Sequence, residues 1–168
     1  MDLHGHRVAL IGGAGFIGHH LAIALVARGA EVAVIDGLEV NHLVHYAALP
    51  STDATREMYL RVLLERLDLL DAAGVTRVRQ DARDYHGLSS ALNDFQPQSI
   101  VHLAAVAHAN RSNKDPFSTF DHSMRTLENA LDWSRSADLH RFVFFSSSMV
   151  YGNFETPEVS EDHPLNPI

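Results

Sequence analysis

The sequence contains no cysteine, a single lysine (Lys114) among its 168 residues, and no apolar run long enough to cross a membrane. Without cysteine the chain cannot form a disulfide or a thiolate metal site. The apolar run near the N-terminus, Val8 to Ile11, is too short for the core of a signal peptide, and a membrane span would need about 18 apolar residues. We therefore expect a cytoplasmic protein with no membrane partner.

Positive charge is also scarce, since the net charge is −8 and the twelve arginines are scattered along the chain. A nucleic-acid partner is not expected, because phosphate binding needs a concentrated basic surface. The twelve histidines do not predict a metal site. No His-x-x-x-His occurs, and His19 and His20 are neighbours that do not share a helix face.

Short apolar runs alternate with amphipathic stretches, a pattern typical of βαβ units and a parallel sheet. The sequence therefore predicts an α/β fold with a doubly wound (Rossmann-like) parallel sheet in three layers, α/β/α. Because the runs are compact and apolar, we expect helices on both faces of every strand. The predicted strands are Arg7–Ile11, Glu31–Ile35, Thr76–Gln80, Ser99–Ala104 and Arg141–Ser146, and the predicted helices include Phe16–Arg28, Tyr85–Phe95 and Phe117–Arg135.

The connection from Leu38 to Gly74 is unusually long. Leu38–Ser51 has no clean period and contains Pro50, which predicts a loop. Leucines then recur at three- and four-residue steps up to Leu70, which predicts an amphipathic crossover helix that Asp53 or Thr52 could cap. A mobile substrate or partner segment is the alternative interpretation of Leu38–Ser51.

The most informative motif is a glycine loop directly between the first strand and the first helix, with Gly12, Gly15 and Gly18 at three-residue spacing. Such glycines allow a tight turn, the close approach of a pyrophosphate and close helix–sheet packing. Phe16 and Ile17 open the helix, where free N–H groups and a partial positive charge face the phosphates. We therefore predict a dinucleotide site.

Asp36 ends the second strand, 18 residues after Gly18. A carboxylate here can accept hydrogen bonds from both adenosine ribose hydroxyls, and it repels a 2′-phosphate. No arginine follows closely, so NAD is favoured over NADP. The alternative is a loop aspartate that caps a turn.

With the glycine loop, three further motifs resemble those of the extended short-chain dehydrogenase/reductases, specifically the NAD-dependent nucleotide-sugar epimerase/dehydratase family. The resemblance covers nearly the whole chain and is weakest from Leu38 to Glu65. The three motifs are Asp81-Ala82-Arg83-Asp84, His102-Leu103-Ala104-Ala105 and Ser146-Ser147-Ser148-Met149-Val150-Tyr151-Gly152.

The resemblance implies cofactor contacts after the third and fourth strands. Asp81 would bind the adenine amino group and Ala82 would contribute its backbone, while Asp84 is the better helix cap and leaves Asp81 free. The small residues around Leu103, Ala104 and Ala105 would let the dinucleotide lie close to the backbone. Simple helix–sheet packing is the alternative for these three residues.

The resemblance also implies substrate-side residues. Ser147, four residues before Tyr151, would be the catalytic hydroxyl, and Ser148 and His108 would face the sugar. A structural role for His108 and strand-end solvation for Ser148 are the alternatives. Sugar 4,6-dehydratases carry Asp-Glu directly after the catalytic hydroxyl residue, where this chain has Ser148-Met149, so epimerisation or oxidoreduction fits better than elimination.

Two departures from the family pattern stand out. Serine replaces the frequent asparagine at position 123, and the family's Tyr-x-x-x-Lys motif does not occur in the 168 residues. In that motif the lysine lowers the pKa of the tyrosine that acts as base. We expect residues 1–168 to be one dinucleotide-binding domain, C-terminally incomplete and truncated before the last strand and the substrate subdomain.

These features predict the cofactor-binding portion of an NAD-dependent nucleotide-sugar epimerase-like enzyme, an oxidoreductase/isomerase that works by transient hydride transfer. We expect the chain alone to be inactive, while the intact enzyme would bind a nucleotide sugar and form a homodimer through Phe117–Arg135. In the absence of a partner, Leu127, Leu131 and Trp133 would be partly uncovered. The alternatives are a non-catalytic NAD-binding or regulatory module and an NAD-dependent sugar dehydratase or reductase.

Overall fold

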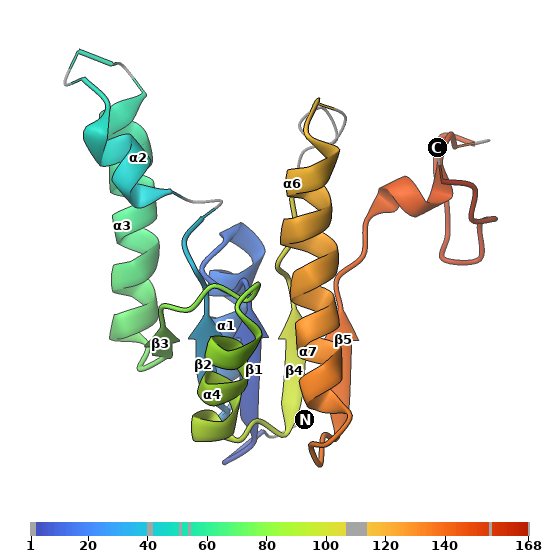
Figure 1. Ribbon diagram of the computed structural model, residues 1–168, viewed down its shortest axis with the longest axis horizontal. Helices are drawn as coiled ribbons and strands as arrows, with labels where there is room; N and C mark the ends of the chain where they lie inside the picture. Colours follow the sequence, from blue (N-terminus) through green and yellow to red (C-terminus); the bar gives the residue numbers. More distant parts are fainter. Residues whose placement is uncertain are drawn as a thin grey trace.

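Five parallel strands form one sheet in the order β3-β2-β1-β4-β5 (Figure 1). The computed structural model describes residues 3–39, 42–50, 52–53, 55–106, 114–154 and 156–167. Strand order reverses direction beside β1, which is the topology of doubly wound dinucleotide-binding folds. The predicted fold is confirmed. The strands are β1 (Arg7–Ile11), β2 (Glu31–Ile35), β3 (Thr76–Val78), β4 (Ser99–His102) and β5 (Arg141–Phe144).

Alternate side chains of β1 enter two separate cores, one on each face of the sheet. Val8 and Leu10 pack with α1 (Phe16–Val26) and α3 (Arg56–Ala72), whereas Ala9 and Ile11 pack with residues of the helices on the opposite face. Those helices are α4 (Tyr85–Phe95) and α7 (Thr126–Ser134), which lie in front of the sheet in Figure 1 while α1 lies behind it. Apolar helix faces on both sides produce the three predicted layers.

The expectation that helices bury every strand is wrong for the two edges of the sheet. In β3, Thr76 and Arg77 are exposed, and in β5 Arg141 and Phe144 are exposed. Both strands have a paired neighbour on one side only. Three strands are also shorter than predicted, since they end at Val78, His102 and Phe144, where the last residues leave the ladder for the loops that follow.

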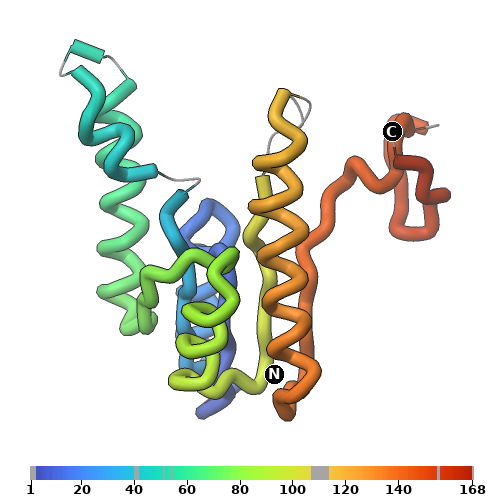
Figure 2. Tube along the Cα trace, in the orientation of Figure 1, coloured from blue at the N-terminus to red at the C-terminus, as the bar shows by residue number. Residues whose placement is uncertain are grey.

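The prediction of a loop over Leu38–Ser51 is wrong in part, because α2 (Leu43–Ala48) lies within it. Six residues are too few to show a helical period, and the His42 side chain accepts the His45 N–H at the start. The predicted crossover helix is α3. Asp53 accepts the N–H groups of Thr55 and Arg56 at its beginning. Figure 2 shows α2 and the first turns of α3 projecting beyond the sheet.

The predicted helix Phe117–Arg135 is present but interrupted. It consists of α6 (Pro116–Phe120), the π-helical segment η1 (Asp121–Arg125) and α7. Trp133 was expected to be partly uncovered, which is wrong: it is buried in the core and its indole N–H donates to Asn93 Oδ1 at 2.9 Å. Leu131 is 45% exposed, as predicted.

Helix α1 ends two residues earlier than predicted, at Val26, and the chain turns through Gly29 at φ +88°. The helices in the described part of the chain are all too short or too polar to cross a membrane.

Candidate functional site

Most of the predicted site residues lie at one edge of the sheet, the carboxyl edge, where loops leave the ends of the parallel strands. Along this edge Asp81 follows β3, Asp36 follows β2, the glycine loop follows β1, Ala104 follows β4 and Ser147 follows β5. Four spacings of about 4.8 Å between neighbouring strands separate the first of these strands from the last, or about 19 Å. Ligands of open α/β sheets bind at this edge, beside the point where strand order reverses.

The glycine loop packs too tightly to accept a side chain at Gly12, Gly13 or Gly18. Gly12 has φ +78°, and a Cβ atom there would lie 2.6 Å from the backbone nitrogen of Ala104. A Cβ atom on Gly18 would overlap the backbone of Gly13. The loop after β1 therefore lies directly against the end of β4 and against the first turn of α1, which is the close packing predicted for this motif.

The amino end of α1 is open to an anion. Gly15 caps the helix in an extended conformation, at φ −71° and ψ −178°, and has no side chain with which to bond the first-turn N–H groups. The first turn, which begins with Phe16 and Ile17, contains no acidic residue. Helix N-terminal N–H groups that lack an intrahelical partner bind anions, and the helix dipole favours negative charge at this end.

Two further side chains, His19 and Arg66, lie beside this turn. The His19 ring nitrogen Nδ1 lies 2.9 Å from the Gly15 carbonyl oxygen, and burial lowers the pKa of His19. The Arg66 guanidinium of α3 lies 5.9 Å from the centre of the Phe16 ring, within the range of a cation–π contact. The first turn of α1 therefore carries a cation beside it, which adds to the positive potential there.

Asp36 connects the second strand to the glycine loop. Its Oδ2 accepts the N–H of Ala14 at 2.9 Å, and its Oδ1 accepts the N–H of Leu38 at 2.8 Å. Burial raises the pKa of this carboxyl, although both backbone hydrogen bonds act in the opposite direction. One acceptor position on each oxygen is already used, as in a turn cap, and the carboxylate retains further lone pairs for ribose hydroxyls.

Asp81 lies beside Gly37, the residue after Asp36, because a Cβ atom on Gly37 would be 3.2 Å from the Asp81 Cα. The prediction that Asp84 caps α4 is confirmed, since its side chain accepts the N–H groups of His86 and Gly87. The prediction that this leaves Asp81 free is wrong. The Arg83 guanidinium donates hydrogen bonds to both Asp81 oxygens, with Nε at 3.0 Å from each and Nη2 at 2.6 Å from Oδ2.

The loop that carries Asp81 is also fixed from α7. The buried Asn129 amide donates to the carbonyl oxygens of Ala82 and Arg83, at 2.9 and 3.0 Å. Ala82 itself is buried. The backbone from Asp81 to Arg83 is therefore held by a helix that lies on the front face of the sheet.

The residues that follow β4 lie against the end of β1 and the glycine loop. Leu103 donates its N–H to the Ile11 carbonyl at 2.8 Å, and Ala104 contacts the position of Gly12. Ala105 is exposed, and the next residue, Val106, donates its N–H to Ser123 Oγ at 3.2 Å. Serine at position 123 thus keeps a hydrogen bond between η1 and the loop after β4. His108 lies outside the described residues.

Ser147 and Ser148 follow β5 and are both exposed. Ser147 caps the short 3₁₀ helix η2 (Ser148–Tyr151), and its Oγ accepts the N–H of Met149 at 3.2 Å. Ser147 is therefore at the same edge as the glycine loop, but at the opposite end of that edge from Asp81. Figure 2 shows the chain after β5 running away from the body of the sheet.

His102 is a buried residue of the motif after the fourth strand to which the sequence assigned no role. It is 0% exposed on β4, with its ring against Phe142 and Phe144 at centroid distances of 6.4 and 6.0 Å. Neither ring nitrogen has a hydrogen-bond partner among the described residues. Burial lowers the pKa of His102 to about 4, so the ring is neutral at pH 7.

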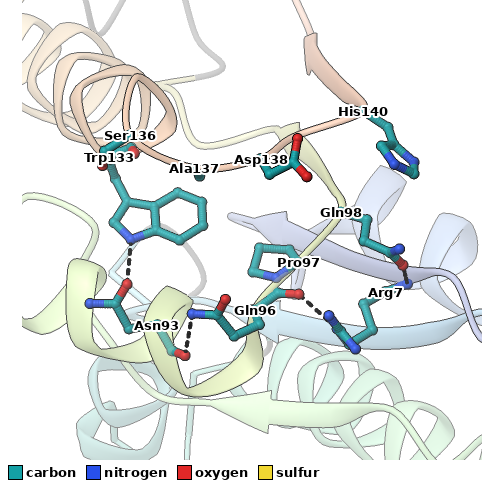
Figure 3. A pocket seen from close by; sticks show the side chains of 10 residues that line it. All are labelled: Arg7, Asn93, Gln96, Pro97, Gln98, Trp133, Ser136, Ala137, Asp138 and His140. Carbon is teal, nitrogen blue, oxygen red and sulfur yellow. Dashed lines mark hydrogen bonds between the residues drawn. The ribbon is translucent and has the colours of Figure 1, made fainter.

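A pocket of about 380 Å³ lies at the amino edge of the sheet, opposite the glycine loop (Figure 3). Its polar groups largely bond to one another: Trp133 donates to Asn93, and Arg7 Nε donates to the Gln96 carbonyl at 2.7 Å. None of the predicted site residues lines it. Among the described residues no group of three or more His, Cys, Asp or Glu side chains could hold a metal ion.

Arg83, Asp121 and Asn129 are the residues that sequence reasoning missed. Arg83 stood two positions after Asp81 in a motif already singled out, so an Asp-x-Arg pair was the available signal. Asp121 and Asn129 lie 38 and 46 residues beyond Arg83. No local pattern links residues at such separations.

Comparison with known proteins matches residues 8–168 to the model of the NAD dependent epimerase/dehydratase family. A curated relative, UDP-glucose 4-epimerase of Lacticaseibacillus casei, is 28% identical over 160 residues, which make up 95% of this chain and 41% of that protein.

Two solved structures show the same arrangement. The UDP-Glc/GlcNAc 4-epimerase from Campylobacter jejuni has a TM-score of 0.76 at 26% identity, over 98% of this chain and 44% of that one. The UDP-glucose 4-epimerase of Thermus thermophilus, in complex with NAD, has a TM-score of 0.70 at 31% identity, over 96% of this chain and 44% of that one. The chain thus spans less than half the length of these relatives.

Proposed function

The chain belongs to the NAD dependent epimerase/dehydratase family, and we propose that it is the NAD-binding part of a nucleotide-sugar epimerase. The observation that carries the proposal is the cradle at the carboxyl edge of the sheet. Side chains are excluded at Gly12 and Gly18, the first turn of α1 is free of acidic residues, and Asp36 stands at the end of the next strand. Relatives with this fold are named as epimerases, one of them in complex with NAD.

In this proposal each part of the edge binds one part of the cofactor. The N–H groups at Phe16 and Ile17 bind the diphosphate, and Asp36 accepts from the adenosine ribose hydroxyls. Asp81 and the backbone of Ala82 bind the adenine, and the small side chains after β4 leave room for the dinucleotide. Because Asp36 is an anion in this position, NAD is preferred over NADP.

Ser147 acts at the substrate end of the edge. Its hydroxyl donates a hydrogen bond to the sugar oxygen that loses and regains a proton, while Ser148 and His108 face the sugar. NAD supplies reversible hydride transfer at its nicotinamide ring. Ser148-Met149 offers no carboxylate for elimination, so epimerisation is favoured over dehydration.

The proton itself requires a base from outside these residues, because no Tyr-x-x-x-Lys occurs in the 168 residues. The proposal therefore assigns residues 1–168 to the dinucleotide-binding domain of a longer, cytoplasmic enzyme. It predicts negligible turnover by the chain alone. A chain that binds NAD but has no active longer form would be a non-catalytic NAD-binding module instead.

Assembly as a homodimer through α6 to α7 belongs to the same proposal. This helical face exposes Phe117 at 79% and Phe120 at 59%, together with Met124 and Leu131. Apolar side chains that gather on one face mark an interaction surface. Analytical ultracentrifugation of the longer enzyme should give a dimer that Phe120→Glu dissociates, and an unchanged dimer would exclude this face.

The test of NAD binding is a calorimetric titration of the chain with NAD and with NADP. We expect saturable binding of NAD with a stoichiometry of one, and weaker binding of NADP. Gly15→Val should abolish binding, because the backbone at φ −71° accepts a valine without strain while the side chain fills the diphosphate position. A folded chain that ignores both nucleotides at millimolar concentration would exclude the proposal, as would a Gly15→Val variant that binds NAD normally.

A further inference from the structure

The side chains of Asp81, Arg83, Asp121 and Arg125 form a continuous chain of ion pairs between the loop after β3 and the π-helical segment η1. Arg83 joins the two acidic residues, with Nη2 at 2.6 Å from Asp81 Oδ2 and Nη1 at 3.1 Å from Asp121 Oδ2. Asp121 is held in turn by Arg125 Nε at 2.5 Å. The side chains of Asp81, Arg83 and Asp121 are only 20–35% exposed.

This arrangement restricts what Asp81 can still bind. A carboxylate has about four acceptor positions. Oδ1 accepts the Arg83 backbone N–H at 2.9 Å and Nε at 3.0 Å, and Oδ2 accepts Nη2 and shares Nε. The Arg83 backbone N–H, Nε–H and Nη2–H are three donors against four acceptor positions, so one acceptor position remains, and its direction is set by the planar guanidinium.

The same contacts fix the ionisation state of the group. The Arg83 hydrogen bonds hold the pKa of Asp81 below its usual range, so the carboxyl is charged at neutral pH and can only accept. Asp121 also has a lowered pKa, mainly because of Arg125. An acceptor with no proton to donate favours a ring that presents an amino group and disfavours one that presents an oxygen.

We propose that Arg83, held by Asp121, is a positioning residue that aims the last free acceptor of Asp81 at the adenine amino group and makes the site selective for adenine. The proposal rests on the proposed function, since it assumes that NAD binds at this edge. The Asn129 contacts to Ala82 and Arg83 hold the backbone of the same loop, so the side-chain network orients Asp81 on a backbone that is already fixed.

The test compares NAD with nicotinamide hypoxanthine dinucleotide, in which an oxo group replaces the adenine amino group. Calorimetric titration of the unmodified chain should give about tenfold or greater preference for NAD, the size expected for a hydrogen bond to a charged group. Arg83→Lys keeps the charge but loses the fork geometry, so the preference should fall to less than about threefold. Asp121→Asn should reduce it in the same direction.

Arg77→Lys is the matched control, because Arg77 forms a similar fork with Asp71, at 2.5 and 2.7 Å, at the other end of β3. It should leave the preference unchanged. The ratio of the two affinities is the deciding quantity, since loss of a merely structural role of Arg83 would lower the affinity for both dinucleotides equally. Thermal unfolding of each variant identifies any that fails to fold. If Arg83→Lys does not fold, the preference measured for Asp121→Asn tests the proposal in its place.

The outcomes separate the two proposals. If the unmodified chain binds neither dinucleotide, the proposed function fails. If it binds both with equal affinity, or if Arg83→Lys and Asp121→Asn keep the full preference for NAD, the adenine-positioning role is excluded while the proposed function stands.

Discussion

The two halves of the carboxyl edge are built differently. In the half after β1, β2 and β3, the carboxylates of Asp36 and Asp81 are each fixed by two or more hydrogen bonds, and Asn129 of α7 donates to the backbone of the loop that carries Asp81. In the half after β5, Ser147 is exposed and its side chain accepts one bond, from Met149. We call these the adenosine half and the substrate half.

The difference follows from what covers each half. The adenosine half lies at the ends of β1 and β2, which are buried from both sides, and of the edge strand β3, and helix α7 donates a side chain to its loops. The substrate half follows an edge strand, where Phe144 and Phe145 are 50% and 41% exposed. The adenosine half is therefore organised by the described residues themselves, whereas the substrate half would be completed by contacts that these residues do not make.

The largest expected effect is that of a side chain at the tightest point of the adenosine half. Gly12→Ala should lower the free energy of unfolding by about 2–5 kcal/mol, because it combines a left-handed backbone with overlap against Ala104. Gly74→Ala is the control, since Gly74 has a similar φ of +76° but open space around it. Gly74→Ala should lower the free energy of unfolding by only about 1–2 kcal/mol, measured by urea unfolding. Equal losses of stability in the two variants would mean that Gly12 is not closely packed.

His102 lies on β4, the strand between the two halves, and its burial should make the free energy of unfolding depend on pH. Its folded pKa of about 4 is lower than the ordinary value of 6.5, so the unfolded chain binds more protons between these two values. Stability from this residue is full above about pH 6.5 and falls by up to about 3 kcal/mol as the pH drops towards 4. His102→Leu should remove that part of the pH dependence of unfolding, and identical pH profiles for the two proteins would contradict the assignment.

Within the adenosine half, Asp36→Asn should weaken NAD binding about tenfold or more, because an amide accepts less strongly than a carboxylate. The affinity of the unmodified chain should be full above the raised pKa of Asp36 and fall as the pH drops through it, since the ionised form is the better acceptor. Asp138→Asn, at the amino edge of the sheet, serves as the calorimetric control. Equal affinity of the Asp36→Asn and Asp138→Asn variants would remove Asp36 from the site.

The smallest effect is expected in the substrate half. Ser147→Ala should change the free energy of unfolding by less than about 0.5 kcal/mol and leave NAD affinity unaltered, because the side chain is exposed and makes one local bond. A longer enzyme with the same substitution should instead lose turnover. A large loss of NAD affinity in the 168-residue chain would show that the two halves are not independent.

The sequence predicted the central strands well because their apolar runs and the glycine loop are local signals. The first two strands and the helix Tyr85–Phe95 have the predicted bounds. The ends of the other strands were too long by two residues, since apolar residues such as Phe145 continue after the ladder stops. Helix α2 was missed because six residues carry no measurable period, and its start depends on a contact between His42 and His45.

The sequence also predicted some residues of the candidate site and missed their long-range partners. Asp36 was singled out by its place after a strand and Asp81 through the family resemblance, and the structure places both at the carboxyl edge. The partners of Asp81 were not singled out, because Arg83 meets Asp121 only after a crossover helix and another strand bring η1 beside the loop. The π-helical turn that carries Asp121 has no signature in the pattern of apolar residues.

The most direct measurement compares ADP-ribose with NAD by calorimetric titration of the chain. ADP-ribose keeps every group assigned to the adenosine half and lacks the nicotinamide ring. If that half holds the cofactor by itself, the two ligands should bind with affinities within about threefold of one another. Failure of ADP-ribose to bind, while NAD binds tightly, would contradict the division of the edge into an organised half and an incomplete one.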